Sequence, residues 1–135
     1  MRTRVVLCGS FHRDSDGLKR LFRELEINGC RILSPLSIDF IDTRQAIVKA
    51  KTESDLEILD LEKFHIRAMR DADLIWLHAP NGHIGLSTAF EIGFATALKK
   101  PIFCSTTPQD EMLQTQITVV ESVFASLEAI SSAVS

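Results

Sequence analysis

The chain has 135 residues, a length typical of one compact domain with its own hydrophobic core. Apolar residues make up 45% and charged residues 24%, as in ordinary globular proteins, and the formal net charge of -3 argues against binding polymeric nucleic acid or an anionic membrane surface. No apolar run has the length that a membrane crossing requires. The apolar run behind the N-terminus covers only residues 5–8, which is too short for a signal peptide, so we expect a cytoplasmic protein.

The cysteines and histidines show neither a disulfide pattern nor a metal-binding pattern. Cys8, Cys30 and Cys104 lie far apart with no C-x-x-C pair, which favours reduced thiols in or near the core. The histidines form no spacing typical of a metal site, so we expect no metal. They are His12, His65, His78 and His83.

The first third of the chain predicts a β-α-β unit. Residues 5–8 form a short apolar, β-branched run that is typical of a buried strand. An apolar stripe at helical spacing predicts a helix over residues 17–28, ended by Gly29, and residues 31–34 predict a second strand. Such a unit favours a parallel sheet with a right-handed crossover.

The middle of the chain divides into a segment without a clear period and a well-signalled helix. Residues 35–52 form a long connection, which indicates either a substrate lid or extra structure at a dimer interface. Ser54 and Glu57 have the spacing of a capping box, and the apolar repeat behind them predicts a helix over residues 55–70. His65 lies with the apolar stripe of that helix, so we expect it to face inward, either as a core histidine or as a site residue.

Residues 71–101 contain the pattern around which the chain is organised. Residues 74–79 predict a buried strand, residues 80–85 predict a turn and a loop, and a helix is expected from about Ser87 to just before Pro101. This order builds half of a βαβ unit. Helix N-termini at the carboxyl edge of such a sheet, where the strands end, present free N–H groups to anionic ligands.

The last third predicts two more strands and a helix. Residues 101–104 and 117–120 read as short strands, and an apolar face indicates a helix from about residue 122. The whole order of elements predicts an α/β fold with a doubly wound sheet, in a single domain over residues 1–135.

Glu91 allows two interpretations. Thr88 and Glu91 have the S/T-x-x-E spacing of a capping box, so Glu91 could serve only to satisfy the start of its helix. Alternatively, a carboxylate can attack an anomeric carbon and form a covalent glycosyl intermediate, and a helix N-terminus would keep it ionised. The spacing alone leaves both interpretations open.

Three stretches of the sequence carry a family resemblance. Residues 85–95 read G-L-S-T-A-F-E-I-G-F-A, residues 97–102 read A-L-K-K-P-I, and residues 8–10 read C-G-S; Ala72 and Asp73 match as well. In these stretches the chain resembles the nucleoside 2-deoxyribosyltransferase superfamily. That group includes transferases that move deoxyribose between bases and N-glycosidases that hydrolyse nucleoside 5′-monophosphates.

The resemblance implies a flavodoxin-like sheet of five parallel strands in the order 2-1-3-4-5. It implies cleavage or transfer at the N-glycosidic bond of a nucleoside or nucleoside 5′-monophosphate, with hydrolysis favoured and Glu91 as the nucleophile. It places His65 where the family usually has an aspartate that contacts the sugar, so His65 is expected to be catalytic, with a pH dependence around 6 to 7. The implied protein needs no cofactor and forms a homodimer or larger oligomer. The expected substrate-binding residues are Gly9, Ser10, His12, Asn81, Gly85 and Ser87.

Two other classes of function stay open. One is a nucleotide-binding or sensing module without turnover, in which His65 has replaced the catalytic aspartate. The other is a plain structural or interaction domain. Release of free base from a panel of nucleosides and nucleotides separates the enzyme from both.

Overall fold

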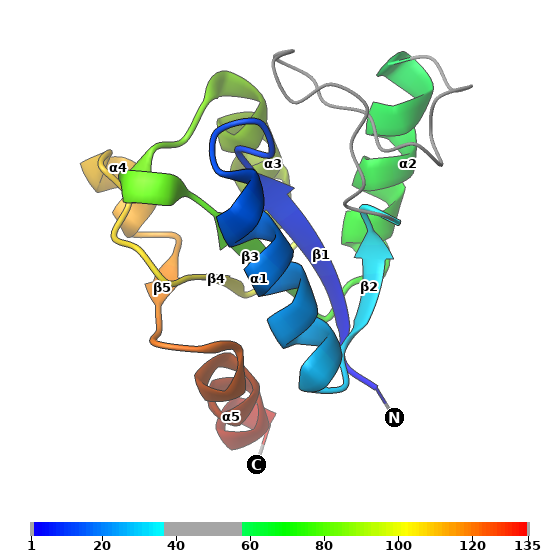
Figure 1. Cartoon of the computed structure of the whole chain (residues 1–135), viewed down its shortest axis with the longest axis vertical. Coiled ribbons are helices and arrows are strands. Elements are labelled where there is room, and N and C mark those ends of the chain that lie inside the picture. Colours follow the sequence, from blue (N-terminus) through cyan, green and yellow to red (C-terminus); the bar gives the residue numbers. More distant parts are fainter. Residues whose placement is uncertain (1, 37–57, 135) are drawn as a thin grey trace.

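Figure 1 shows a computed structural model of the chain, which describes residues 2–36 and 58–134. The strands are β1 (Arg4–Gly9), β2 (Arg31–Ser34), β3 (Leu74–His78), β4 (Ile102–Cys104) and β5 (Thr118–Val119). The helices are α1 (Ser15–Ile27), α2 (Ile58–Asp71), α3 (Leu86–Ala97), α4 (Glu111–Gln114) and α5 (Val123–Val134), with a short 3₁₀ turn η2 (Pro80–Gly82).

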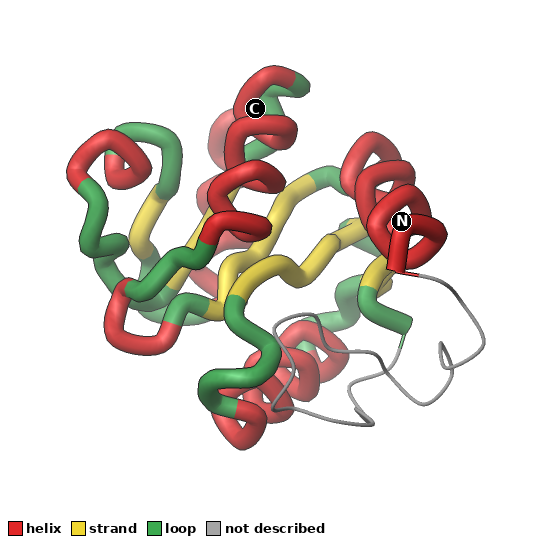
Figure 2. Tube along the Cα trace, turned by 90° about the horizontal axis from the view of Figure 1, so that it is seen from above, coloured by secondary structure: helices red, strands yellow, loops and turns green. Residues whose placement is uncertain are grey.

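The predicted sheet is confirmed. Its five strands pair in parallel in the order β2-β1-β3-β4-β5, and helices cover both faces (Figure 2). One apolar cluster joins α2 and α3 to side chains such as Val6 and Leu77, and the other joins α1 and α5 to their neighbours on the strands, such as Leu7 and Trp76. Successive side chains along β1 and β3 therefore enter opposite clusters, as expected for strands that are buried on both faces. It places Cys8 on the face that α2 and α3 cover.

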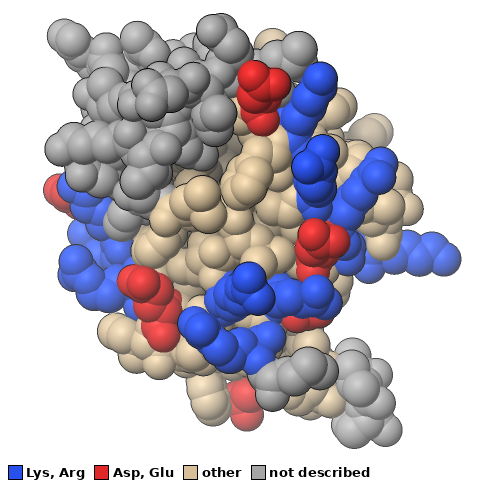
Figure 3. All heavy atoms as spheres, turned by 90° about the vertical axis from the view of Figure 1, so that its right-hand side faces the viewer, with Lys and Arg blue, Asp and Glu red and all other residues tan. Residues whose placement is uncertain are grey.

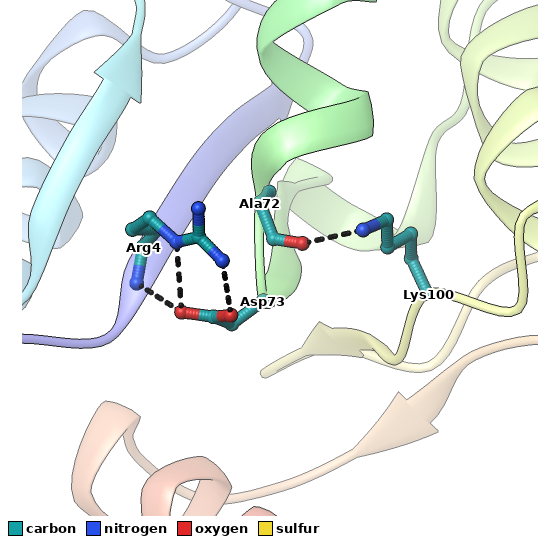
Figure 4. Close-up of polar contacts among 4 residues, drawn as sticks. All are labelled: Arg4, Ala72, Asp73 and Lys100. Carbon is teal, nitrogen blue, oxygen red and sulfur yellow. Dashed lines mark hydrogen bonds and ion pairs between the residues drawn. The ribbon is translucent and has the colours of Figure 1, made fainter.

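Polar contacts tie the strands together at the amino edge of the sheet, where the strands begin (Figure 4). The Arg4 backbone N–H donates to Asp73 Oδ2 at 2.8 Å, and Arg4 Nη2 lies 3.1 Å from Asp73 Oδ1. Lys100 Nζ donates to the carbonyl oxygen of Ala72 at 2.7 Å. The residues Ala72 and Asp73 that carried part of the family resemblance therefore have a structural role, far along the strands from the carboxyl edge.

The capping-box interpretation of Glu91, one of the two that the spacing left open, is wrong. Helix α3 begins at Leu86 after Gly85, with no side-chain cap hydrogen bond, so Thr88 is already inside the helix. Glu91 is the sixth residue of α3 and lies in its second turn, where the backbone N–H groups are already paired within the helix. The helix N-terminus therefore does not account for the state of this carboxyl.

Other boundaries differ little from those predicted. Helix α1 begins earlier than expected because the Asp14 side chain accepts from the Gly17 N–H at 3.0 Å and caps it. Helix α4, a single turn capped in the same way by Asp110, was not predicted from the sequence. The predicted capping box of α2 and most of the 35–52 connection lie outside the described residues. Among the described helices, none has the length and apolar character needed to cross a membrane.

Candidate active site

Glu91 lies in the interior of the molecule on the buried side of α3. Its neighbours on that helix face, Thr88, Ile92 and Ala95, are also buried, because residues three and four apart share one side of a helix. Only 10% of the Glu91 side chain is exposed. A carboxyl group that is buried without a full ion partner is costly, which makes it a candidate for function.

His65 lies against Glu91, as the family resemblance predicts. It projects inward from α2 with 12% of its side chain exposed, and its Nε2 atom lies 3.5 Å from Glu91 Oε2. The same Nε2 atom lies 3.3 Å from Cys8 Sγ on β1. On the other side of the ring, Nδ1 is 2.7 Å from the hydroxyl oxygen of Ser34, which is buried at the end of β2. We call Glu91, His65, Cys8 and Ser34 the Glu91 cluster.

The contacts of His65 fit either neutral tautomer of the ring. With a proton on Nδ1, the ring donates to Ser34 Oγ and Nε2 can accept from the Cys8 thiol. With a proton on Nε2, the Ser34 hydroxyl donates to Nδ1 and the ring donates to Glu91. Burial lowers the pKa of His65 to about 4, so the ring is neutral at physiological pH. The expected pH dependence in the range around 6 to 7 is therefore not supported.

Burial acts on Glu91 in the opposite sense. It raises the pKa of the Glu91 carboxyl to about 8, and the charge of nearby Glu62 on α2 raises it further, while a contact with Cys8 opposes the shift. Burial also raises the pKa of the Cys8 thiol well above its usual value, and the charge of Glu91 adds to this. The expectation that Glu91 is held ionised is thus wrong for the free protein, in which the protonated carboxyl predominates at neutral pH.

The residues predicted to bind substrate all lie at or near the carboxyl edge of the sheet, around the end of β1 and the segment that joins β3 to α3. Ser10 is buried and donates its N–H to the carbonyl oxygen of His78 at 3.0 Å, whereas His12 is exposed. Asn81 and Ser87 are exposed, and Gly85 precedes α3. Within the described part of the chain, no side-chain hydrogen bond joins any of these six residues to the Glu91 cluster.

Gly9 is the one predicted binding residue whose identity the backbone dictates. Its φ angle is +132°, and a Cβ atom built on it would lie 2.1 Å from the carbonyl oxygen of His78. Only glycine permits both features. The ring of His78 is held as well, with Nε2 3.0 Å from the carbonyl oxygen of Asp14 at the start of α1. The β1–α1 loop is therefore pressed closely against the end of β3.

A shallow hollow adjoins the Glu91 cluster between α2 and α3. Its volume is about 280 Å³, and it is lined by Glu62, Lys63, Ile66, Arg67, Arg70 and Phe90. Figure 3 shows that Lys and Arg side chains gather around an uncharged area on this side of the molecule. Arg70 also lies over the Phe94 ring, with 5.7 Å from its guanidinium carbon to the ring centroid. Glu62 connects the two regions, since it lines the hollow and its charge acts on Glu91.

The sequence predicted that Glu91 and His65 share a site but did not predict the other groups around them. Cys8 was expected in or near the core, and Ser34 only marked the end of a strand. Strand alternation could have placed Cys8 opposite α2 and α3, and the three-residue spacing puts Glu62 one helical turn before His65. Cys8, His65 and Glu91 each present one possible metal-ligand atom, and these atoms lie within 4.8 Å of one another.

The comparisons with known proteins agree with this architecture. The profile of the family described as nucleoside 2-deoxyribosyltransferase matches residues 5–128. The solved structure of a CMP N-glycosidase, BcmB, from Clostridium botulinum is similar, with 16% identity, a TM-score of 0.57, and 96% of this chain and 98% of that chain covered.

A 2-deoxyribosyltransferase from Leishmania mexicana is also similar, with 15% identity, a TM-score of 0.55, and 94% of this chain and 95% of that chain covered. At these identities the likeness concerns the fold. Among curated proteins, none matches this sequence.

Proposed function

This chain belongs to the nucleoside 2-deoxyribosyltransferase family, and from that premise we propose that it cleaves or transfers at the N-glycosidic bond of a nucleoside or nucleoside 5′-monophosphate, with Glu91 as the nucleophile. The observation that carries this proposal is the buried Glu91 carboxyl beside His65 on the face that α2 and α3 cover. We favour hydrolysis over transfer of the sugar to a second base.

The proposed chemistry needs an ionised Glu91. Its carboxylate attacks C1′ of the sugar, the C1′–N bond breaks, and the electron pair leaves with the base. Water then adds to C1′ of the glycosyl ester, which frees the sugar and restores the carboxylate; in a transferase a second base takes the place of water. Because burial raises the pKa of Glu91 to about 8, the ionised form is the minor one at pH 7 in the free protein. The raised pKa also makes the ionised form a stronger base and hence a better nucleophile.

His65 acts in this proposal as a neutral polar partner. Ser34 orients its ring, so Nε2 faces the region in front of Glu91, where it can accept a hydrogen bond from a sugar hydroxyl. Gly9, Ser10, His12, Asn81, Gly85 and Ser87 form the substrate-binding surface along the carboxyl edge. The loop that begins at Gly9 gives a 5′-phosphate the exposed side chains of His12 and Arg13. The backbone N–H groups of Ser10, Phe11 and Arg13 already donate to carbonyl oxygens.

Two further properties belong to the proposal. The hollow beside the Glu91 cluster, with the apolar side chains of Phe90 and Leu86 exposed on α3, supports a homodimer or larger oligomer. The three cysteines are free thiols buried in the fold, which fits a protein kept in a reducing compartment such as the cytoplasm.

Release of free base tests the proposal directly. Ribonucleosides, deoxyribonucleosides and their 5′-monophosphates, CMP among them, are incubated with the protein, and the free base is separated and quantified. The proposal expects release from at least one member of the panel, with the same substrate inert in the Glu91→Gln variant. A panel without any release, for a protein that binds one of its members, would favour the second candidate.

That second candidate is a nucleotide-binding or sensing module without turnover. The specific observation in its favour is the form of the Glu91 cluster itself, because a protonated carboxyl beside a neutral histidine is not a reactive pair. Binding of a nucleotide, measured by calorimetry, without base release between pH 6 and 9 would support it.

A further inference from the structure

The Glu91 cluster combines three kinds of side chain that zinc prefers. Cys8 supplies a sulfur, His65 an imidazole nitrogen and Glu91 a carboxylate oxygen, each from a different element of the fold. Thiolate and imidazole ligands together are typical of zinc, whereas magnesium and calcium select oxygen ligands. Glu91 is the only one of the three that the proposed cleavage reaction uses as a reacting group.

The distances between these atoms match those around a tetrahedral zinc ion. Zinc bonds of about 2.0 Å to nitrogen and oxygen and about 2.3 Å to sulfur place tetrahedral ligand atoms about 3.3–3.6 Å apart. Cys8 Sγ and His65 Nε2 are 3.3 Å apart, and His65 Nε2 and Glu91 Oε2 are 3.5 Å apart. All three ligand atoms lie within 4.8 Å of one another, so two of the three separations already suit a tetrahedral ion, and Cys8 Sγ and the Glu91 carboxylate oxygen must come to about 3.5 Å when it binds.

A second observation concerns the far side of the His65 ring. Metal-binding histidines almost always use their other ring nitrogen to hold a polar partner, which fixes the ring and its tautomer. Here Nδ1 lies 2.7 Å from Ser34 Oγ, and Ser34 is 98% buried, since only 2% of it is exposed. In the tautomer with its proton on Nδ1, the ring donates to Ser34 and the Nε2 lone pair points at Cys8 and Glu91, as a metal ion would require.

We propose that Cys8, His65 and Glu91 bind one zinc ion, with water in the fourth position. Binding releases the thiol proton of Cys8, and that of Glu91 where it is protonated, to the solvent. Because the ion takes the Glu91 carboxylate, zinc and glycosidic cleavage exclude each other. This last consequence rests on the proposed function, whereas the metal site itself does not.

Cobalt(II) tests the site without any substrate, since it replaces zinc and reports on its ligands by absorption. The full-length protein is titrated with Co²⁺ and then with Zn²⁺ under reducing conditions. We expect a thiolate-to-cobalt charge-transfer band in the near ultraviolet and the strong visible bands of a tetrahedral ion, both complete at one equivalent of cobalt. One equivalent of zinc should then remove these bands. Absence of the charge-transfer band would overturn the proposal.

Three variants identify the ligands. Cys8→Ser is expected to lose the charge-transfer band and to weaken zinc binding more than about 100-fold, since loss of an outer partner alone costs about 10–100-fold. Ser34→Ala should keep the band and weaken binding within that smaller range. The matched control is Cys104→Ser, which removes another buried cysteine, one whose sulfur contacts Thr106. This variant should leave the charge-transfer band and the zinc affinity unchanged. An unchanged band in Cys8→Ser would place the metal elsewhere and refute the site.

Two further readouts cover the case in which a variant does not fold. Zinc should raise the melting temperature of the parent protein, and this shift should shrink in His65→Gln, whose circular dichroism shows whether it is folded. Where base release is detected, zinc should suppress it and a chelator should restore it. If the protein shows the expected cobalt bands but releases no base, the metal site is supported and only the proposed function is rejected.

Discussion

The two ends of the sheet each hold a carboxyl group beside a basic side chain, and the two pairs behave in opposite ways. At the amino edge, Arg4 and Asp73 lie 3.1 Å apart with 48% and 39% of their side chains exposed. In the Glu91 cluster, His65 and Glu91 lie 3.5 Å apart with 12% and 10% exposed. Hydrogen bonding to Arg4 lowers the pKa of Asp73, whereas burial raises the pKa of Glu91 to about 8.

The difference shows that the partner sets the pKa shift in the exposed pair, whereas burial sets it in the buried pair. Solvent keeps both members of the Arg4–Asp73 pair ionised, so its hydrogen bonds add to a favourable state. Burial removes the charge from both members of the His65–Glu91 pair, because neither ion is compensated in the interior. A pair held neutral in this way adds little to stability but can supply a reactive carboxylate when it ionises. The predictions below test this contrast.

The largest effect is expected from Glu91→Gln. The amide has the same shape and no charge to bury, so the fold should be kept, while loss of the nucleophile should lower base release by about 10⁴-fold or more. Base release and thermal melting are measured on the same preparations. Glu128→Gln, at an exposed position on α5, is the matched control and should retain full activity. Unchanged turnover in Glu91→Gln would contradict the assignment of the nucleophile.

Gly9→Ala should be the most destabilising of these variants. A methyl group would meet the His78 carbonyl oxygen at 2.1 Å, and φ of +132° strains any side chain, so we expect a loss of about 3 kcal/mol or more in the free energy of unfolding. Gly93→Ala is the control, because Gly93 is exposed in α3 with nothing within 4 Å of such a methyl group; it should gain up to about 1 kcal/mol. Urea denaturation compares them, and an equal response of the two variants would disprove the close contact.

His65 variants distinguish a positioning role from a structural one. His65→Leu should keep the fold, since a large apolar side chain suits a mostly buried position, but lower base release by about 10²-fold. His65→Asp restores the aspartate typical of the family and should preserve or raise base release. If instead Leu unfolds the protein and neither variant releases base, His65 is a structural histidine and the binding module is the better account.

The pH dependence follows from the shifted pKa values. If Glu91 must be ionised, kcat/KM rises about tenfold per pH unit and levels off near pH 8. Since the folded pKa of Glu91 is above the unfolded value of 4.5, its contribution to stability is lost as pH rises from about 4.5 through 8. The lowered pKa of His65 acts oppositely, with stability lost as pH falls from 6.5 to about 4. Melting curves of the parent and Glu91→Gln across this range should therefore converge at low pH and separate at high pH.

The smallest effect is expected from the exposed pair. Asp73→Asn keeps an acceptor for the Arg4 N–H and removes only a solvent-screened charge, so the melting temperature should fall by about 3 °C or less. The fall should diminish at high salt, which screens surface charges. A larger loss that salt does not alter would show that the amino edge depends on this pair more than its exposure indicates.

Periodicity was enough to predict most of the fold, because apolar spacing reports directly on buried strands and helix faces. The elements around β1, β3 and α3 were placed within a few residues, and α4 was missed because one turn carries no periodic signal. The order of the strands came from family resemblance. Local spacing failed for Glu91, since Thr88 and Glu91 have the capping-box pattern inside a helix that already began at Leu86.

The candidate site could be predicted only in part, for a physical reason. Inward-facing positions can be read from a helical stripe, which placed His65 toward the core. The pKa values cannot be read in this way, because they depend on burial and on Glu62, Cys8 and Ser34, which the fold brings in from other elements. The sequence therefore indicated which residues meet but not that both would be uncharged at neutral pH.

The central claim is that the Glu91 carboxylate forms a bond to the sugar. Its most direct test is intact-protein mass spectrometry after rapid acid quench of the protein with a substrate from the panel, at pH 8, followed by peptide mapping. We predict an added mass equal to the sugar moiety, or to the sugar phosphate for a nucleotide, located on Glu91 and absent in Glu91→Gln. Base release by the parent protein with an adduct on another residue, or undiminished base release by Glu91→Gln, would contradict the account.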